Sequence, residues 1–380
     1  MKKKYITFSL VTLVLLVALI TSFNYFKTTN AYIDDSVNNQ TKITKGISMN
    51  LEQTAGAGNY KTVTRSSWPT EGYKFNAELS RCENGSTLSW DDTKKAVIVS
   101  GNLSDKCYVY FDIYQPTLAE YIKSQYTGTQ GDNGIYYHNS TLANGAGDNS
   151  YRYAGASDSV NNYICLGSDE ATCPEANLFR IIGVFGDKTK VIRAKSVGDK
   201  EWNTSADNTW SSSSLNTYLN GEYLTSLGTL ADKIATTTWK AGGGIWSNIV
   251  TSVPKTAYQN EVGSSASTTT VNKKIGLMYV SDYYYSASPS AWTLVGYNSS
   301  DATKDYRAAK TINWLYLGSY EWTISRNSDR PDSAFRVDST GRVNHFSVPS
   351  SYAVRPSFNL ESSVKYVSGS GSMSDPVRVN

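Results

Sequence analysis

The clearest alternation of apolar and polar residues lies near the C-terminus. Residues 334–338 alternate between apolar and charged side chains, which predicts a half-buried strand. After a turn that contains glycine, residues 342–348 predict the returning strand, and their apolar positions fall out of step near Asn344, which predicts a β-bulge. Residues 353–360 predict a third strand, in which Pro356 should lie at an edge or a bulge because it has no amide hydrogen.

Apolar runs earlier in the chain predict a second hairpin and several helices. Residues 177–185 and 189–196 are two apolar-rich stretches joined by a Gly-Asp turn, as in a β-hairpin. Serines followed by apolar residues at helical spacing predict a helix over 211–227, and residues 227–239 predict a second, weaker one. Residues 275–286 predict a strand that leads into a short aromatic turn or helix.

An uncharged apolar run covers residues 5–26, and this length is sufficient to cross a bilayer. Three lysines precede it, which predicts that the N-terminus stays inside and the remainder is exported. Two interpretations are open: an anchor that is retained, or a signal peptide cleaved after Ala31. We therefore expect a signal or anchor segment at 1–31 and a polar stalk at 32–45, with the body on the outer face of the cell membrane or secreted.

Short strands separated by glycine and asparagine turns predict a small all-β domain over residues 46–116. Cys82 and Cys107 flank its hairpin-like middle, and in an exported protein two such cysteines should form a disulfide. Cys165 and Cys173 bracket a short loop further along the chain and predict a second, local disulfide.

Three motifs follow one another near the C-terminus: the segment EWTISR, the hairpin AFRVDSTGRV and the strand VRPSFNL. Their order resembles a family of uncharacterised surface domains from Gram-positive, mainly gut-dwelling bacteria, which are similar to the C-type-lectin-like fold shared with formylglycine-generating enzymes. This chain departs from the family in lacking a doubled tryptophan and in having Ser357 in place of the usual alanine. The resemblance covers roughly the last two-thirds of the chain and implies fold more than function.

The resemblance implies an α+β chain, with a C-type-lectin-like domain over residues 117–380 that follows the small all-β domain and the N-terminal membrane segment. The formylglycine-generating relatives use cysteines inside this domain. No cysteine follows Cys173, so that activity is not carried over to this chain.

Composition and charge narrow the range of functions. The chain is rich in tyrosine, serine, threonine and asparagine, which is typical of an exported β-rich protein. Without the N-terminal lysines the chain is close to neutral, so it has no basic surplus to bind nucleic acid. His138 and His345 lack metal-binding spacing, and the carboxylates show no recognisable acid–base pair. We predict no cofactor, although a calcium site built from loop carboxylates and carbonyls stays open.

Aromatic side chains crowd the region before the C-terminal hairpin and suggest binding without catalysis. We expect a cell-surface ligand-binding or adhesion protein that contacts a glycan or a host or bacterial surface protein. The alternative is an envelope hydrolase that acts on glycan or peptidoglycan. Trp314 and Trp322 are expected in the core, whereas the three consecutive tyrosines could lie inside or outside. The predicted ligand-binding residues are Tyr283, Tyr284, Tyr285, Trp292, Tyr297, Arg326 and Asp329.

Overall fold

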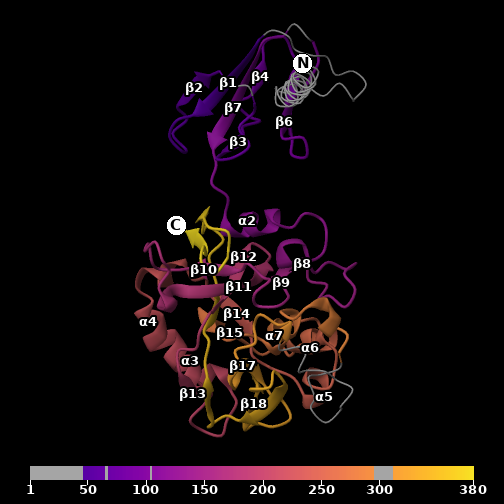
Figure 1. Ribbon diagram of the computed structural model, residues 1–380, viewed down its shortest axis with the longest axis vertical. Coiled ribbons are helices and arrows are strands. Elements are labelled where there is room, and N and C mark those ends of the chain that lie inside the picture. Colours follow the sequence, from indigo (N-terminus) through magenta and orange to yellow (C-terminus); the bar gives the residue numbers. More distant parts are fainter. Residues whose placement is uncertain (1–45, 65–66, 103–104, 295–310) are drawn as a thin grey trace, which may run out of the picture. The chain divides into compact units, whose positions relative to one another are not determined.

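The computed structural model describes residues 46–64, 67–102, 105–294 and 311–380. These residues form two compact units, and the boundary between the units lies between Gln115 and Pro116 (Figure 1). The predicted membrane segment 1–31 and stalk 32–45 lie outside the described residues. None of the helices in the described ranges has the length and apolar character that a bilayer crossing requires.

Short strands build the N-terminal unit, and they form one mixed sheet and one hairpin. The sheet has the order β2-β1-β7-β3, with β4 also paired to β7, and only the β1–β7 pair is parallel. Strands β5 and β6 form the hairpin. The strands are β1 (Ile47–Glu52), β2 (Tyr60–Val63), β3 (Tyr73–Phe75), β4 (Arg81–Cys82), β5 (Thr87–Asp91), β6 (Ala96–Ser100) and β7 (Cys107–Ile113).

The core of this unit forms around the central strand β7. Cys107, Val109 and Phe111 alternate with more exposed neighbours, as a half-buried strand requires. The rings of Trp68 and Trp90 both pack on Phe111. Cys82 and Cys107 lie opposite each other on β4 and β7 and form the predicted disulfide.

Asp105, two residues before β7, holds the loop that follows β4 through hydrogen bonds. It is fully buried and accepts hydrogen bonds from the amides of Asn84 (2.8 Å) and Ser86 (3.0 Å). Burial opposes the charge, but the hydrogen bonds from Ser86 and Asn84 outweigh it and lower the pKa of Asp105 to about 2. The native state therefore gains stability from this carboxylate at any pH above its ordinary pKa.

We expect the N-terminal unit to lose stability as the pH falls from about 4 to about 2, because protonation of Asp105 removes an acceptor that the folded state uses. Hydrogen exchange of the amides of residues 46–115, followed across this range, measures the loss. The Asp105→Asn variant should be less stable at neutral pH and should vary less over the same range. Parallel curves for the two proteins would contradict the assignment.

The C-terminal unit is organised around a sheet with the order β16-β21-β12-β11-β10-β23-β22. Two further strands extend this sheet: β9 pairs with β11, and β8 pairs with β9. The predicted hairpin of residues 177–196 is its centre, formed by β11 and β12. Its strands are β8 (Ile135–Tyr137), β9 (Tyr151–Tyr153), β10 (Tyr163–Cys165), β11 (Leu178–Phe185), β12 (Lys188–Arg193), β16 (Ile275–Gly276), β21 (Ser357–Asn359), β22 (Tyr366–Ser368) and β23 (Val377–Val379).

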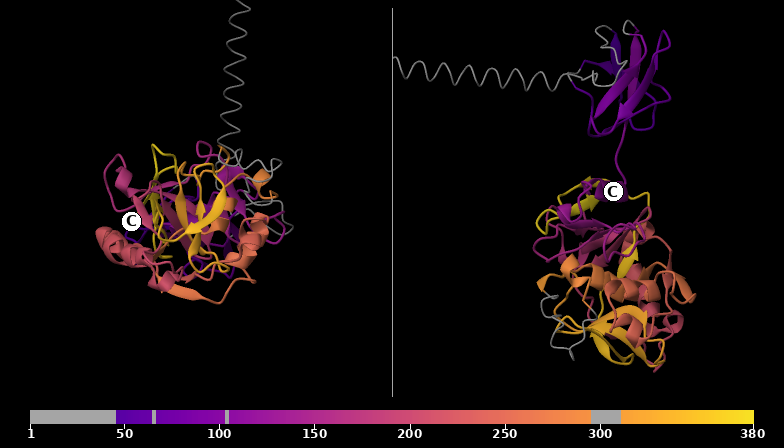
Figure 2. Two further views of the ribbon diagram at one scale, coloured as in Figure 1. Left: turned by 90° about the horizontal axis from the view of Figure 1, so that it is seen from below. Right: turned by 90° about the vertical axis from the view of Figure 1, so that its right-hand side faces the viewer.

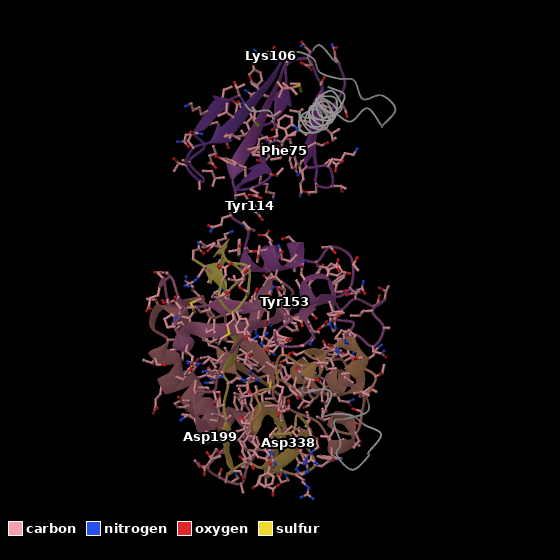
Figure 3. The ribbon with its side chains drawn as sticks, viewed as in Figure 1. Phe75, Lys106, Tyr114, Tyr153, Asp199 and Asp338 are labelled. Atoms are coloured by element: carbon pink, nitrogen blue, oxygen red, sulfur yellow. A yellow bond between two sulfur atoms is a disulfide. The ribbon has the colours of Figure 1, made fainter. Side chains whose placement is uncertain are left out.

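A second sheet of this unit has the order β13-β20-β17-β18-β19, and a separate pair is formed by β14 and β15. Asp199 on β13 and Asp338 after β18 mark this second sheet in Figure 3. Its strands are β13 (Asp199–Glu201), β17 (Glu321–Arg326), β18 (Ser333–Val337), β19 (Val343–Ser347) and β20 (Ser351–Ala353), and the pair comprises β14 (Thr237–Lys240) and β15 (Thr270–Lys273).

Helices lie on either side of the strands of the C-terminal unit, with α3 and α4 on one side and α5, α6 and α7 on the other (Figures 1 and 2). The predicted helix over 211–227 begins at the N-cap Ser213 and contains one wider π turn, η4. The helices are α2 (Leu118–Ser124), α3 (Ser214–Tyr218), η4 (Leu219–Tyr223), α4 (Leu224–Ser226), α5 (Trp246–Ile249), α6 (Pro254–Glu261) and α7 (Val280–Tyr285), with 3-10 turns η1 (Asp132–Gly134), η2 (Glu175–Asn177), η3 (Trp210–Ser212), η5 (Gly228–Lys233) and η6 (Pro289–Ala291).

Four local predictions need correction. The second helix, over 227–239, is only the 3-10 turn η5 followed by β14. The strand predicted from residue 275 is shorter than expected and ends after Gly276, while the short aromatic helix predicted to follow it is α7, which begins at Val280. The β18–β19 pair keeps one register throughout, so the bulge near Asn344 is absent from this hairpin.

The fourth correction concerns the predicted strand 353–360, which is interrupted around Pro356. Its first part belongs to β20 in the second sheet and its last part forms β21 in the central sheet. Proline has no amide hydrogen for a ladder, so the chain can change sheets there. Arg355, in the interruption, is buried and forms a two-bonded ion pair with Glu321 of β17.

The architecture as a whole is mixed α+β. The second predicted disulfide, Cys165–Cys173, joins the end of β10 to the loop before η2. Two disulfides in one chain are typical of proteins that fold in an oxidising, extracellular environment.

Candidate functional site

The aromatic residues predicted to contact a ligand are enclosed in the core of the C-terminal unit. Tyr283, Tyr284 and Tyr285 on α7 and Trp292 after η6 are each at most 1% exposed. Their polar atoms are used internally: the three hydroxyls donate to backbone carbonyls and the indole of Trp292 donates to the carbonyl of Ala287. These four residues were predicted to contact a ligand from a loop, but they belong to an internal helix and the turn after it, and for the three tyrosines the inside position is confirmed.

The other predicted residues are dispersed. Arg326 is half-buried at the end of β17, and its Nε donates to the carbonyl of Gly242 at 3.0 Å. Asp329 is exposed in the loop that follows, and Tyr297 lies outside the described residues. Trp314 and Trp322 are buried, which confirms that they belong to the core.

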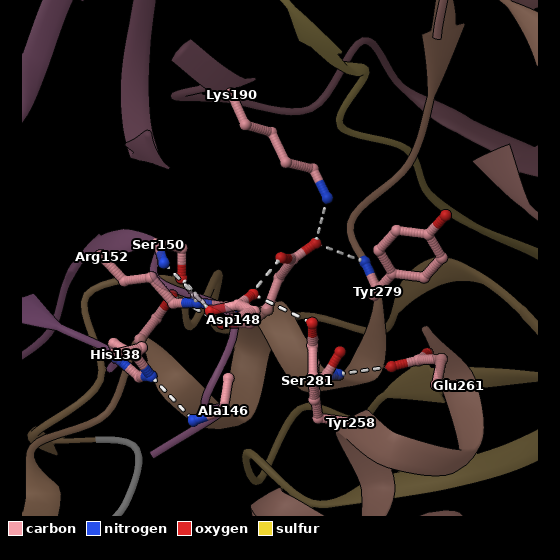
Figure 4. Close-up of polar contacts among 12 residues, drawn as sticks. His138, Ala146, Asp148, Ser150, Arg152, Lys190, Tyr258, Glu261, Tyr279 and Ser281 are labelled. Atoms are coloured by element: carbon pink, nitrogen blue, oxygen red, sulfur yellow. Dashed lines mark hydrogen bonds and ion pairs between the residues drawn. The ribbon is translucent and has the colours of Figure 1, made fainter. Parts of the chain in front are cut away.

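A different group of side chains forms the candidate site, namely four charged residues that are buried together in the C-terminal unit (Figure 4). Arg152 on β9, Lys190 on β12 and Asp282 on α7 are each at most 4% exposed. Asp148, in the loop before β9, completes the group and is largely covered. Charges are rarely buried unless they are paired, so this group has a structural or binding reason to exist.

Lys190 and Asp282 form the inner pair. The Lys190 Nζ atom lies 2.5 Å from Oδ2 of Asp282, which also accepts the amide of Tyr279 at 2.8 Å. The ammonium group is 4.5 Å from the centre of the Tyr279 ring and 5.3 Å from that of Trp239. Burial lowers the pKa of Lys190, and the charge of Asp282 opposes this shift.

Arg152 and Asp148 form the outer pair. Nη2 of Arg152 lies 2.6 Å from Oδ2 of Asp148, and its Nε donates to Ser150 Oγ at 2.7 Å. The Tyr258 hydroxyl donates to the same Asp148 oxygen at 3.0 Å. Burial acts against the Asp148 charge, but Arg152 and the hydrogen bonds from Ser150 outweigh it and hold the pKa of Asp148 well below its ordinary value. Nη1 of Arg152 lies 4.0 Å from Asp282, so the two pairs form one network.

Glu261, at the end of α6, is a third buried carboxyl beside this network. It accepts hydrogen bonds from the amides of Val280 and Ser281, each at 2.8 Å, and from the hydroxyl of Ser325. Burial raises the pKa of Glu261, and these hydrogen bonds oppose the shift. Glu261 therefore fixes the first turn of α7, the helix that carries Asp282.

A pocket of about 170 Å³ opens beside the charged network. Its wall combines charged groups with aromatic rings, namely Arg152, Lys190, Trp239, Tyr258, Tyr279 and Asp282. Thr238 of β14 also lines the pocket and is exposed, which places it nearer the solvent than the buried charges. Convergent polar groups in a small aromatic pocket are the usual features of a ligand site.

A larger cavity, of about 770 Å³, lies between the loop closed by Cys165–Cys173 and the C-terminal strands. Its carboxylates, Asp169, Glu170 and Asp375, are exposed side chains rather than groups fixed in the protein interior. We therefore place the candidate site at the smaller pocket, where the polar groups are buried and held by several partners.

The histidines do not add catalytic chemistry to this pocket. His138 is fully buried, its Nδ1 accepts the amide of Ala146 at 3.1 Å, and its ring packs on Tyr285 and Trp292. Burial, together with the charge of Arg152, lowers the pKa of His138 well below its ordinary value, so the ring is neutral. In the described part of the chain, no three His, Cys, Asp or Glu side chains are placed to hold a metal ion.

The sequence does not directly indicate this network, because its members are far apart in the chain. Lys190 and Asp282 are 92 residues apart, and Asp148 and Tyr258 are 110 apart. One signal was present in the sequence: Lys190 and Arg152 stand within short apolar or aromatic strands, where a charge must find a buried partner.

Comparisons of the chain with protein-family models, with curated proteins and with solved structures find no match. The resemblance to lectin-like surface domains is thus neither supported nor contradicted by them, and the site must be interpreted from its own geometry.

Proposed function

We propose that the chain is an extracellular, non-catalytic ligand-binding protein, and that the pocket beside Lys190 and Asp282 receives one neutral sugar residue of a glycan. The observation that carries the proposal is the composition of this pocket, in which two buried cations are paired with two carboxylates beside aromatic rings.

The balance of charge supports a neutral ligand. Arg152 and Lys190 offset Asp148 and Asp282, so the buried charges have no surplus of either sign, and the remaining charged side chain of the lining is the half-buried Lys240. An ammonium group has three donors, and Lys190 gives one hydrogen bond to Asp282, which leaves donors for a ligand oxygen. Sugar hydroxyls can accept from such a donor and donate to a carboxylate, while the apolar face of the ring packs on an aromatic side chain.

The same contacts favour binding over turnover. A catalytic base or nucleophile needs a carboxylate or a hydroxyl that is free to act on the substrate. Here Asp148 is engaged by Arg152, Ser150 and Tyr258, and Glu261 is engaged by the first turn of α7. Groups held this firmly provide a rigid surface for recognition.

A substitution at the pocket entrance tests the proposal without disturbing the buried charges. We expect the purified full chain to bind at least one of the methyl glycosides of glucose, galactose, mannose or N-acetylglucosamine, as measured by saturation-transfer NMR and calorimetry. Thr238→Trp should fill the entrance and abolish this binding, while Thr236→Trp, a change at an exposed threonine outside the pocket lining, should preserve it.

Two results would overturn the proposal. Undiminished binding by the Thr238→Trp protein would place the sugar elsewhere. Release of a new product from an oligosaccharide or peptidoglycan fragment, lost in the same variant, would make the protein an envelope hydrolase.

A further inference from the structure

Arg336 on β18 differs from the paired cations of the C-terminal unit, because two of its guanidinium nitrogens have no hydrogen-bond partner among the described residues. Arg152, Lys190 and Arg355 are each paired with a carboxylate. Arg336 is 7% exposed, yet its Nε and Nη1 atoms are buried without a hydrogen-bond acceptor in the described ranges. A buried guanidinium without an anion or acceptor is costly, so within the described residues this charge is left to be satisfied by another group.

Three aromatic rings enclose the Arg336 guanidinium. The distances from Cζ to the ring centres are 4.2 Å for Tyr320, 4.6 Å for Phe346 and 4.5 Å for Tyr352. These cation–π contacts cover the faces of the guanidinium plane, but they do not use its N–H groups, which lie in the plane. The donors of Nε and Nη1 are therefore unused, and a planar acceptor such as a carboxylate, which arginine binds through two parallel hydrogen bonds, can satisfy them once the covering side chains move aside.

The rings around Arg336 form an exposed aromatic patch on the second sheet. Tyr320 is 42% exposed and Phe346 is 44% exposed, among the largest apolar exposures in the described residues. This second sheet lies at the end of the C-terminal unit that faces the viewer in the left-hand view of Figure 2. Because these two rings are surface side chains, they can turn aside and admit a group to the guanidinium beneath them.

We propose that this patch, formed by Tyr320, Arg336, Phe346 and Tyr352, is a docking site for a protein partner, whose aspartate or glutamate side chain pairs with Arg336. Charge complementarity fixes the class of the contacting group, since an unpaired arginine calls for an anion. Tyrosine, phenylalanine and arginine are enriched in protein interfaces, and tyrosine and arginine are among the residues that carry most of the binding energy there, which favours a protein over an acidic glycan. The docking site is separate from the sugar pocket and does not depend on it.

A glutamate-rich peptide, with its glutamine counterpart as the neutral control, probes the docking site on the purified full chain by fluorescence anisotropy. We expect the glutamate peptide to bind, and Arg336→Met to weaken this binding roughly tenfold or more, because a hydrogen bond to a charged group contributes about that much. Phe346→Ser should weaken it as well. Lys195→Met, which removes an exposed lysine of the same unit, and Thr238→Trp should leave it unchanged.

The melting temperature of the Arg336→Met variant shows whether the variant is folded. It should equal or exceed that of the unmodified protein, because the substitution removes an unpaired buried charge. Equal binding of the two peptides, or binding that is insensitive to Arg336→Met, would overturn the proposal. Tighter, Arg336-dependent binding of polygalacturonate than of the glutamate peptide would overturn it in favour of an acidic glycan.

Discussion

Serine in place of Tyr283, Tyr284 and Tyr285 together is expected to prevent the C-terminal unit from folding. All three rings are fully buried on α7, and truncation of a buried aromatic side chain costs about 3–5 kcal/mol. Three such losses are comparable to the whole free energy of unfolding of a domain, about 5–15 kcal/mol. Near-ultraviolet circular dichroism and a thermal melt of the variant would show the loss of the native transition.

The corresponding triple phenylalanine variant is the matched control, since it keeps the three rings. It loses the hydrogen bonds from the hydroxyls to the carbonyls of Gly341, Ile249 and Asn144. Each of these is worth about 1 kcal/mol, so this protein should melt cooperatively at a lower temperature. A triple serine variant with a nearly native melt would show that the rings lie outside the core.

The burial of all three tyrosines follows from the surroundings of α7. Successive residues of a helix point in directions about 100° apart, so three in a row cover most of its circumference. Tyr283 reaches the turn of the C-terminal hairpin, Tyr284 reaches the end of α5, and Tyr285 reaches a loop before β9. A helix that is covered on every side has no polar stripe, and its sequence then shows no helical periodicity from which burial could be predicted.

Features that depend on neighbouring residues were predictable from the sequence. The hairpins β11–β12 and β18–β19 follow from apolar stretches joined by turns, and the two disulfides follow from the spacing of cysteines in an exported chain. The change of sheet at Pro356 was predictable only in part. Proline indicated an irregularity in the strand, but the two sheets that it separates are a property of the tertiary structure.

The candidate site was not predictable in the same way, because each contact joins segments that the sequence does not relate. Lys190 on a central strand, Arg152 on an added strand and Asp282 on an internal helix meet only after the sheet and α7 have packed. A charged residue within an apolar strand shows that a buried partner is needed, but it does not show which carboxylate supplies it.

Removal of Arg355 is expected to lower the free energy of unfolding of the C-terminal unit by about 3–5 kcal/mol, because it leaves Glu321 as an unpaired buried carboxylate. Nε and Nη2 of Arg355 lie 2.7 and 2.8 Å from the two oxygens of Glu321, and Nη2 also donates to the carbonyl of Leu315. The pair connects β17 to the segment where the chain passes between the two sheets. Urea denaturation of Arg355→Met, followed by circular dichroism, measures the loss.

Two further variants test whether the buried Arg355–Glu321 pair contributes more stability than an exposed salt bridge. Lys195→Met breaks the exposed pair with Glu175 and should cost at most about 1 kcal/mol. The double variant Arg355→Met with Glu321→Leu should recover most of the stability, because two apolar residues of similar size can replace a buried ion pair. If Arg355→Met costs no more than Lys195→Met, the pair does not hold the sheets together.

The loss in Arg355→Met should depend on pH in a defined direction. Burial raises the pKa of Glu321 above its ordinary value of 4.5, and Arg355 opposes this shift, so removing Arg355 lets the pKa rise further. A carboxyl with a raised pKa in the folded state favours folding below its unfolded pKa and loses this contribution as the pH rises through the folded one. The deficit of Arg355→Met should therefore be smaller at about pH 4 than at neutral pH, and a deficit that grows on acidification would contradict the role of Glu321.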